Sequence, residues 1–210
     1  MTASGLERTI RRAAARHAPA DREVQRCQLC LQPVTDRHAH LLDTEAGELL
    51  CACHACTILF ARGQASRGHY RLVPSRRIRL SGLSPQALGV PVSLAFFVRS
   101  SGGQVTANYP SPAGATRWEL DPATWERACT ACSSLRDLEP DVEAVLLHTA
   151  RGRNEIWLLP IDECYRLVAI VRQHWQGMSG GDRVWEQIDT FFAGIGQDET
   201  AGQRPPLRGG

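Results

Sequence analysis

The sequence contains no lysine, and all 24 of its basic residues are arginine. Together with the abundant alanine, glycine and proline, this pattern indicates coding bias, so arginine in place of lysine is not evidence for bidentate anion recognition. The net charge is only +2, which is too small to indicate nucleic-acid binding by the chain as a whole. The single basic concentration is interpreted as a solvated segment, because Tyr70 is its only aromatic residue. That segment contains Arg62, Arg67, Arg71, Arg76, Arg77 and Arg79.

Long hydrophobic runs are also missing. No stretch of 18 apolar residues is present, which excludes a conventional transmembrane helix and predicts no membrane insertion. The first residues are rich in arginine and alanine but have no apolar core, so they do not resemble a secretory signal. We therefore expect a cytoplasmic protein, in which cysteine pairs are metal ligands more often than disulfides.

Cysteine, by contrast, is concentrated in one short region. Five of the eight cysteines lie between residues 27 and 56, and they include two Cys-x-x-Cys pairs separated by 22 residues. Tetrahedral Zn²⁺ prefers four soft ligands, which two such pairs supply from two short turns. The sequence therefore predicts a metal site formed by Cys27, Cys30, Cys53 and Cys56, with Zn²⁺ favoured over iron.

The order of elements around these pairs resembles a treble-clef zinc finger. A turn at Cys27–Cys30 precedes a predicted hairpin whose loop is 44–47, and a helix then begins near Cys53. This zinc-binding module is predicted to span residues 24–62. It is too small to bury a sufficient core without the metal, whose binding typically contributes about 10–16 kcal/mol to folding.

Three further residues in the module carry metal-binding side chains. A loop at 44–47 pairs Asp43 with Glu48, which brings His40 opposite Cys51 and His38 opposite Cys53, all on one face of the hairpin. His38, His40 and Cys51 are then either packing and hydrogen-bonding support for a single zinc, or ligands of a second, labile transition-metal site.

The longer part of the chain, residues 70–196, is predicted to be an α+β domain with an antiparallel sheet and helices on one face. Strands are predicted at 92–99, 105–109, 117–120, 142–149 and 155–159. Asp121, Asp162 and Asp182 are expected to cap three helices. Residues 63–69 are expected to form a linker, 1–23 a flexible or short helical N-terminus, and 197–210 a disordered tail.

The remaining cysteines fall on apolar stripes of the predicted helices. Cys129 and Cys132 share a stripe with Trp125, Ala128 and Leu135, and Cys164 shares one with Leu167 and Val171. Such cysteines usually act as small buried hydrophobic residues. We expect all three to belong to the core and not to a metal site.

Three functions are compatible with a four-cysteine site. The favoured one is a non-enzymatic zinc-binding accessory protein, since no catalytic constellation is evident. The second is a His–metal-finger nuclease or a nucleic-acid-binding zinc protein, with His38 or His40 as the base; the segment after Cys56, however, offers no further metal ligand. The third is a rubredoxin-like iron electron carrier, which would be coloured.

Several motifs resemble an uncharacterised actinobacterial family that carries a domain-of-unknown-function name. The resemblance covers most of residues 24–195 and rests on Cys27-Gln-Leu-Cys30, His38-Ala-His40, Cys51-Ala-Cys53-His-Ala-Cys56, Tyr70-Arg-Leu-Val-Pro74 and Tyr109-Pro-Ser-Pro-Ala-Gly114, among others. Members are often encoded beside uptake nickel–iron hydrogenases. The resemblance therefore implies a role in hydrogenase assembly or maturation, with hydrogenase subunits or maturation factors as partners. It supplies no catalytic residues.

Overall fold

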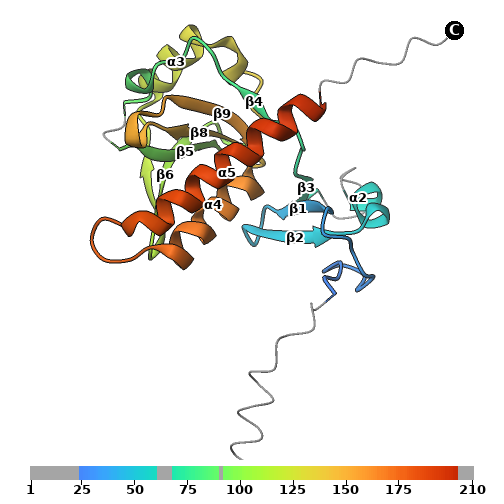
Figure 1. The fold of residues 1–210 in the computed structure, drawn as a ribbon. Helices are drawn as coiled ribbons and strands as arrows, with labels where there is room; N and C mark the ends of the chain where they lie inside the picture. The colour runs from blue at the N-terminus through green and yellow to red at the C-terminus, as the bar shows by residue number, and fades with distance from the viewer. Residues whose placement is uncertain (1–23, 61–67, 90–91, 203–210) are drawn as a thin grey trace, which may run out of the picture.

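The protein folds around two antiparallel sheets, a small one near the N-terminus and a larger one that follows (Figure 1). The structure is a computed structural model, and it describes residues 24–60, 68–89 and 92–202. The predicted α+β class with antiparallel sheets and an N-terminal cysteine cluster is confirmed. The predicted N-terminal helix and most of the predicted linker lie outside the described residues. No helix in the described part of the chain is long and apolar enough to cross a membrane.

The larger sheet has six antiparallel strands in the order β4-β9-β8-β5-β6-β7. Its strands are β4 (Ile78–Arg79), β5 (Leu94–Arg99), β6 (Val105–Ser111), β7 (Gly114–Glu119), β8 (Glu143–His148) and β9 (Glu155–Pro160). Strand β8 lies at the centre, where its register pairs Leu146 with Phe96 on one side and with Trp157 on the other. Five of these strands overlap segments that the sequence predicted.

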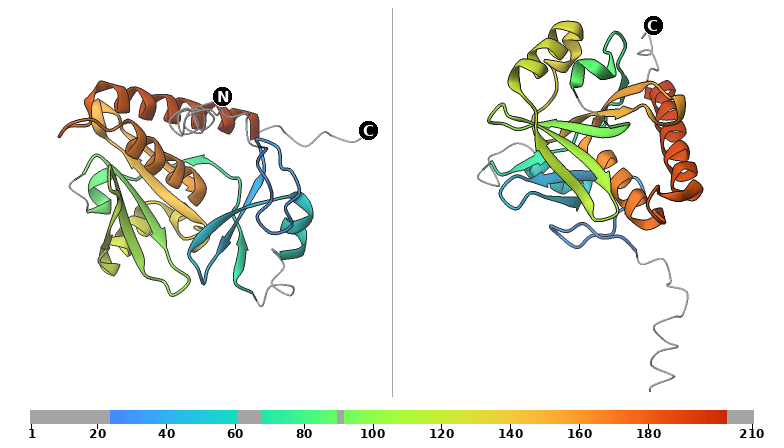
Figure 2. Two further views of the ribbon diagram at one scale, coloured as in Figure 1. Left: turned by 90° about the horizontal axis from the view of Figure 1, so that it is seen from below. Right: turned by 90° about the vertical axis from the view of Figure 1, so that its left-hand side faces the viewer.

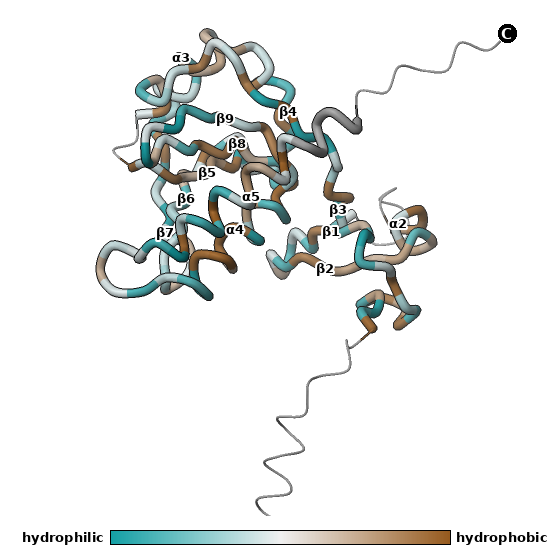
Figure 3. The backbone as a smooth tube through the Cα atoms, viewed as in Figure 1, coloured by the Kyte–Doolittle hydropathy of each residue, from teal (hydrophilic) through white to brown (hydrophobic). Residues whose placement is uncertain are grey.

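Helices cover both faces of this sheet, so the prediction of helices on one face is wrong. Every residue of β8 is buried, and its side chains alternate between two cores. Val145 and Leu147 join the core beneath α3 (Pro122–Ala131), whereas Ala144 and Leu146 join the core beneath α4 (Ile161–His174) and α5 (Gly181–Gly202). Figure 2 shows the two helical layers on opposite sides of the strands. A central strand without a polar face requires cover on both sides, and hydrophobic colouring runs along β5 and β8 (Figure 3).

Of the three aspartates predicted to cap helices, one holds the cap position and two do not. Asp121 caps α3, and its side chain accepts a hydrogen bond from the backbone N–H of Thr124. Helix α4 begins two residues earlier than expected, so Asp162 lies inside its first turn and Pro160 holds the cap position. Asp182 likewise lies within the first turn of α5 and pairs with Arg151. Helix α5 continues to Gly202, past the predicted start of a disordered tail at 197.

The smaller sheet has the order β2-β1-β3, with β1 (Ala39–Asp43), β2 (Glu48–Ala52) and β3 (Tyr70–Leu72). The short helix α2 (His54–Phe60) follows β2. The sequence assigned 70–72 to the second domain, but β3 pairs with β1. The predicted division between 62 and 70 therefore does not separate the two sheets. Short 3-10 helices at Pro85–Leu88, Ser133–Leu135 and Ala150–Gly152 complete the described secondary structure.

The small sheet packs directly against the larger unit. Leu42 of β1 and Val73, just after β3, are buried in the same hydrophobic core as α4 and α5, and Leu49 of β2 packs against it. Since β1 residues alternate between faces, the neighbouring Leu41 points the other way, into the core that surrounds the cysteines. The β1–β2 hairpin therefore connects the cysteine cluster to the α+β unit.

Candidate metal centre

Cys27, Cys30, Cys53 and Cys56 converge from two turns, and their sulfur atoms all lie within 4.8 Å of one another. The first turn is closed by hydrogen bonds from the backbone N–H of Leu31 to the oxygen of Cys27 and from the N–H of Cys27 to the oxygen of Gln32, each at 2.8 Å. Leu31 adopts a left-handed φ of 65° to complete it. The second pair flanks the start of α2, with Cys53 just before it and Cys56 in its first turn.

The geometry of this cluster fits a tetrahedral metal. Zn–S bonds of about 2.3 Å place the sulfurs of a tetrahedral site about 3.8 Å apart, and the Cys30 and Cys53 sulfurs are 3.6 Å apart. Four thiols at this spacing match the ligand set of a structural zinc site. The same donor set also suits iron, so the identity of the metal stays a prediction.

The thiols of Cys27 and Cys56 differ in how readily they ionise. Burial disfavours the Cys27 thiolate, but hydrogen bonds from the backbone N–H groups of Cys53, Leu29 and Cys30 outweigh it and lower its pKa to about 6. The pKa of Cys56 is raised, chiefly by burial and then by its contacts with the other three thiols. The Cys27 thiolate is thus favoured without a metal, whereas binding of a metal by Cys56 would release the proton of that thiol.

The apolar core around the cluster is small. Its fully buried members are Cys27, Leu41, Ala52 and Cys56, with a few partly buried neighbours. Two of these four residues, Cys27 and Cys56, belong to the candidate metal cluster themselves. A metal bound by Cys27 and Cys56 would therefore supply much of the stabilisation that a larger hydrophobic core provides elsewhere.

His38, His40 and Cys51 form a second group whose ligand atoms also lie within 4.8 Å of one another. His40 pairs with Cys51 across the hairpin, in the register that the sequence predicted. The ladder ends at the pair Ala39 and Ala52, so His38 and Cys53 lie beyond it. Cys53 turns to the four-cysteine cluster, whereas His38 stays with His40, and their ring centroids are 4.7 Å apart.

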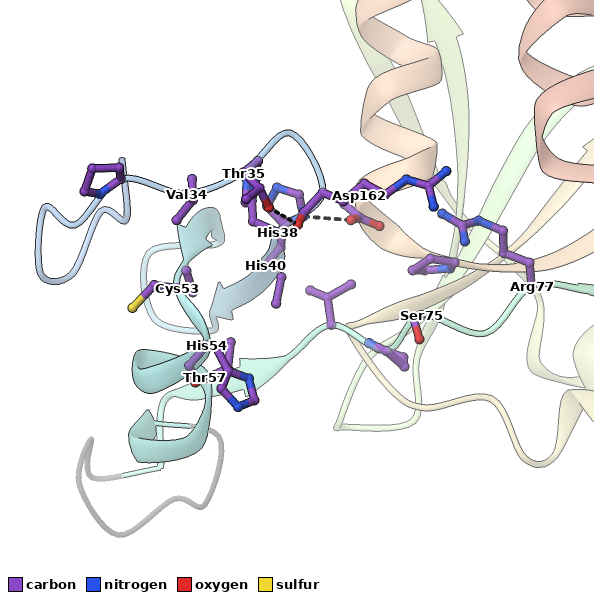
Figure 4. A pocket seen from close by; sticks show the side chains of 17 residues that line it. Val34, Thr35, His38, His40, Cys53, His54, Thr57, Ser75, Arg77 and Asp162 are labelled. Atoms are coloured by element: carbon purple, nitrogen blue, oxygen red, sulfur yellow. Dashed lines mark hydrogen bonds and ion pairs between the residues drawn. The ribbon is translucent and has the colours of Figure 1, made fainter. Parts of the chain in front are cut away.

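Sequence reasoning missed Asp162, which approaches this second group from α4. The Nδ1 of His40 lies 2.8 Å from Oδ2 of Asp162, although the two residues are 122 positions apart in the chain. His38, His40 and Asp162 line a cavity of about 600 Å³ between the module and the larger unit (Figure 4). The only sequence signal for Asp162 was its predicted role as a helix cap, which it does not fill.

The other three cysteines belong to the core, as predicted. Cys129 on α3 and Cys132 at its C-terminal end are buried against the sheet, and Cys164 on α4 is fully buried. Burial raises the pKa of the thiols of Cys129 and Cys164. The thiols of Cys129 and Cys164 are therefore protonated at neutral pH, and all three cysteines are buried.

Three arginines of the basic segment pair with carboxylates of the larger unit. Arg71 contacts Asp141 at 3.2 Å, Arg76 contacts the buried Glu143 at 2.5 Å, and Arg77 contacts Glu163 at 2.6 Å. Arg79 lies over the ring of Trp157, and Arg62 and Arg67 lie outside the described residues. The prediction of a solvated segment is therefore wrong for Arg71, Arg76 and Arg77. These residues connect the module to the larger unit.

A family model described as a family of unknown function, DUF5947, matches residues 26–199. No curated protein and no solved structure matches the chain significantly. The matched range begins one residue before the first cysteine pair and ends within α5, so it includes both candidate metal groups and the whole six-stranded sheet. The chain belongs to this family of unknown function, DUF5947.

Proposed function

We propose that this protein is a non-enzymatic accessory protein whose N-terminal module is held together by one Zn²⁺. Cys27, Cys30, Cys53 and Cys56 would bind the ion, in a module of treble-clef type. The observation that carries the proposal is the convergence of four thiols within 4.8 Å from a closed turn and a helix start. Structural zinc sites are closed in this way, with four protein ligands and no position left for a substrate.

Protein–protein interaction is the activity that the surface of the module supports. Ten large apolar side chains are exposed in the described residues, and five of them lie within residues 24–72. Ile58 and Leu59 of α2 are 52% and 58% exposed, next to the cysteine cluster. An exposed apolar surface at α2 is compatible with a docking site for another protein.

The three aspartates near the helix starts of the larger unit have structural partners. Asp121 caps α3, Asp162 accepts a hydrogen bond from His40, and Asp182 pairs with Arg151. Each side chain is thus engaged in positioning the fold. This supports a binding role over an enzymatic one.

The nature of the partner comes from the family resemblance. The resemblance implies an association with uptake nickel–iron hydrogenase genes, and this supports hydrogenase subunits or their maturation factors as the proposed partners. The module would dock onto one of them, and the α+β unit would supply further binding surface. Within this proposal the zinc keeps the docking surface folded and does not take part in chemistry.

Affinity purification and gene deletion test the proposal together. The tagged protein, isolated from cells that express the hydrogenase, should recover hydrogenase subunits or maturation factors. Deletion should lower hydrogenase activity, and wild-type protein but not the Cys56→Ser variant should restore it. Full hydrogenase activity in the deletion strain, with none of these partners recovered, would show that the proposed role is wrong.

A further inference from the structure

The second cluster has its own ligand geometry, separate from the four cysteines. His40 on β1 and Cys51 on β2 face each other across the hairpin, and His38 lies just before β1. Their potential ligand atoms are within 4.8 Å of one another, and none belongs to the four-cysteine group. A cation with metal–nitrogen bonds of about 2.0 Å and metal–sulfur bonds of about 2.3 Å would draw these atoms closer together.

Hydrogen bonds set both histidines in the same tautomer. The Nδ1 of His38 is 2.8 Å from the carbonyl oxygen of Thr35, and the Nδ1 of His40 is 2.8 Å from a carboxylate oxygen of Asp162. Carbonyl and carboxylate oxygens only accept hydrogen bonds, so each Nδ1 carries the proton. Each Nε2 therefore presents a lone pair, which is the arrangement that metal-binding histidines adopt in proteins.

The Nε2 of His38 is the clearest sign that a ligand is missing from this cluster. The atom is buried, and it has no hydrogen-bond partner among the described residues. A buried acceptor without a hydrogen-bond partner is destabilising. A cation beside Nε2, shared with His40 and Cys51, would remove that destabilisation and explain why three metal-binding side chains meet here.

We propose that His38 Nε2, His40 Nε2 and Cys51 Sγ bind a second divalent cation of borderline softness, of the Zn²⁺, Co²⁺ or Ni²⁺ type. Two imidazoles and one thiolate suit this class of ion. Three protein ligands leave one coordination position, and His38 and His40 line the cavity of about 600 Å³ from which water or an exchanging ligand reaches it. This site is open and exchangeable, in contrast to the closed four-cysteine site.

Asp162 is the positioning residue of this site. Its Oδ1 accepts a hydrogen bond from the backbone N–H of Glu163 at 2.9 Å, which fixes the carboxylate on the first turn of α4. Its Oδ2 then orients the ring of His40 (Figure 4). Because α4 belongs to the larger unit and His40 to the module, binding of the cation strengthens the contact between them.

Cobalt titration of the full-length, zinc-loaded protein tests the site. We expect one equivalent of Co²⁺ to bind while mass spectrometry shows that the original zinc is retained. Coordination by Cys51 should add a near-ultraviolet sulfur-to-cobalt charge-transfer band. The Cys51→Ser variant should lose that band, and Asp162→Asn should weaken cobalt binding about 10- to 100-fold, as changes beside metal-binding histidines do.

The control is His54→Ala, because His54 lines the same cavity but is not part of the cluster. It should bind cobalt as the wild type does, which separates the site from adventitious binding by surface imidazoles. A stoichiometry unchanged by Cys51→Ser, or a loss caused equally by His54→Ala, would overturn the proposal. If Cys51→Ser does not fold, Asp162→Asn decides, since its substitution lies outside the module; wild-type cobalt affinity in that variant contradicts the proposal.

Discussion

The guanidinium of Arg76 holds the fully buried carboxylate of Glu143 with two hydrogen bonds, from Nε at 2.5 Å and from Nη2 at 2.6 Å. Arg76 lies on the segment that leads from the small sheet to β4, and Glu143 begins the central strand β8. A bidentate pair of this kind is geometrically specific. It fixes the connecting segment to the middle of the larger sheet.

Removing Arg76 should therefore be costly. Arg76→Ala leaves a buried carboxylate with one remaining bond, from the backbone N–H of Glu139, and breaking such a pair typically costs about 3–5 kcal/mol. We expect a loss of unfolding free energy near the lower end of this range, because the Arg76 side chain is 41% exposed. Urea unfolding measures the loss. The double variant Arg76→Ala/Glu143→Gln should recover part of it, and a loss no larger than that of a surface pair, about 0.5 kcal/mol, would contradict this view.

Stability should also fall in acid because of His148. This residue is buried, its ring stacks on Phe192 at 4.4 Å, and burial lowers its pKa despite the nearby carboxylates of Glu155 and Asp189. The folded protein then binds fewer protons than the unfolded chain. The contribution of neutral, buried His148 to the free energy of unfolding is fully present above the pKa of histidine in the unfolded chain, about 6.5. It decreases as the pH falls from that value toward the lower pKa of the folded state.

The comparison that isolates this effect is His148→Phe, which keeps an aromatic ring against Phe192. Unfolding free energies at pH 8 and pH 5 should differ less in the variant than in the wild type. The quantity compared is the change in unfolding free energy between pH 8 and pH 5, so a destabilisation that is the same at both pH values cancels. Equal pH dependence in both proteins would show that His148 does not contribute.

Gly180, in the turn between α4 and α5, should tolerate no side chain. It has a φ of 90°, and a Cβ there would lie 2.9 Å from Val184 and 3.2 Å from Trp175. Gly177 in the same turn has a φ of 63° but open space around it. Gly177→Ala should cost only the conformational term, about 1–2 kcal/mol. Gly180→Ala should cost more, and equal melting temperatures for the two variants would contradict the crowding seen at Val184.

Loss of the metal should unfold the module before the larger unit. The core around Cys27, Leu41, Ala52 and Cys56 shares no buried residue with the two cores of the six-stranded sheet. After treatment with a chelator, hydrogen exchange should accelerate in β1, β2 and α2, whereas β5, β8 and β9 should stay protected. Uniform loss of protection would show that the two parts unfold as one.

The local features of the fold were predictable because short-range patterns determine them. The loop at 44–47 fixes the register that sets His40 opposite Cys51, and Asp43 shapes that loop by accepting hydrogen bonds from the N–H groups of Glu45 and Ala46. Proline at 122 after Asp121 marks the start of α3. The spacing of the two Cys-x-x-Cys pairs similarly predicted the four-sulfur cluster.

The long-range features were not predictable in the same way. The partner of His40 is 122 residues away, and nothing near Asp162 in the sequence distinguishes it from an ordinary helix cap. The pairing of Arg76 with Glu143 depends on the same tertiary arrangement. The helical cover on both faces, in contrast, is indicated by the sequence of β8. Its residues 144–147 form an apolar run without polar alternation, which is typical of a strand buried on both faces.

The central claim is that Cys27, Cys30, Cys53 and Cys56 bind one structural zinc, and metal content measured by native mass spectrometry tests it most directly. Protein purified without added metal and dialysed against a weak chelator should retain one zinc per chain, and Cys56→Ser should lose it. Cys129→Ser, which alters a cysteine of the α3 core, should keep the zinc. A wild-type protein that carries iron or no metal, or a Cys56→Ser variant that retains its zinc, would contradict the claim.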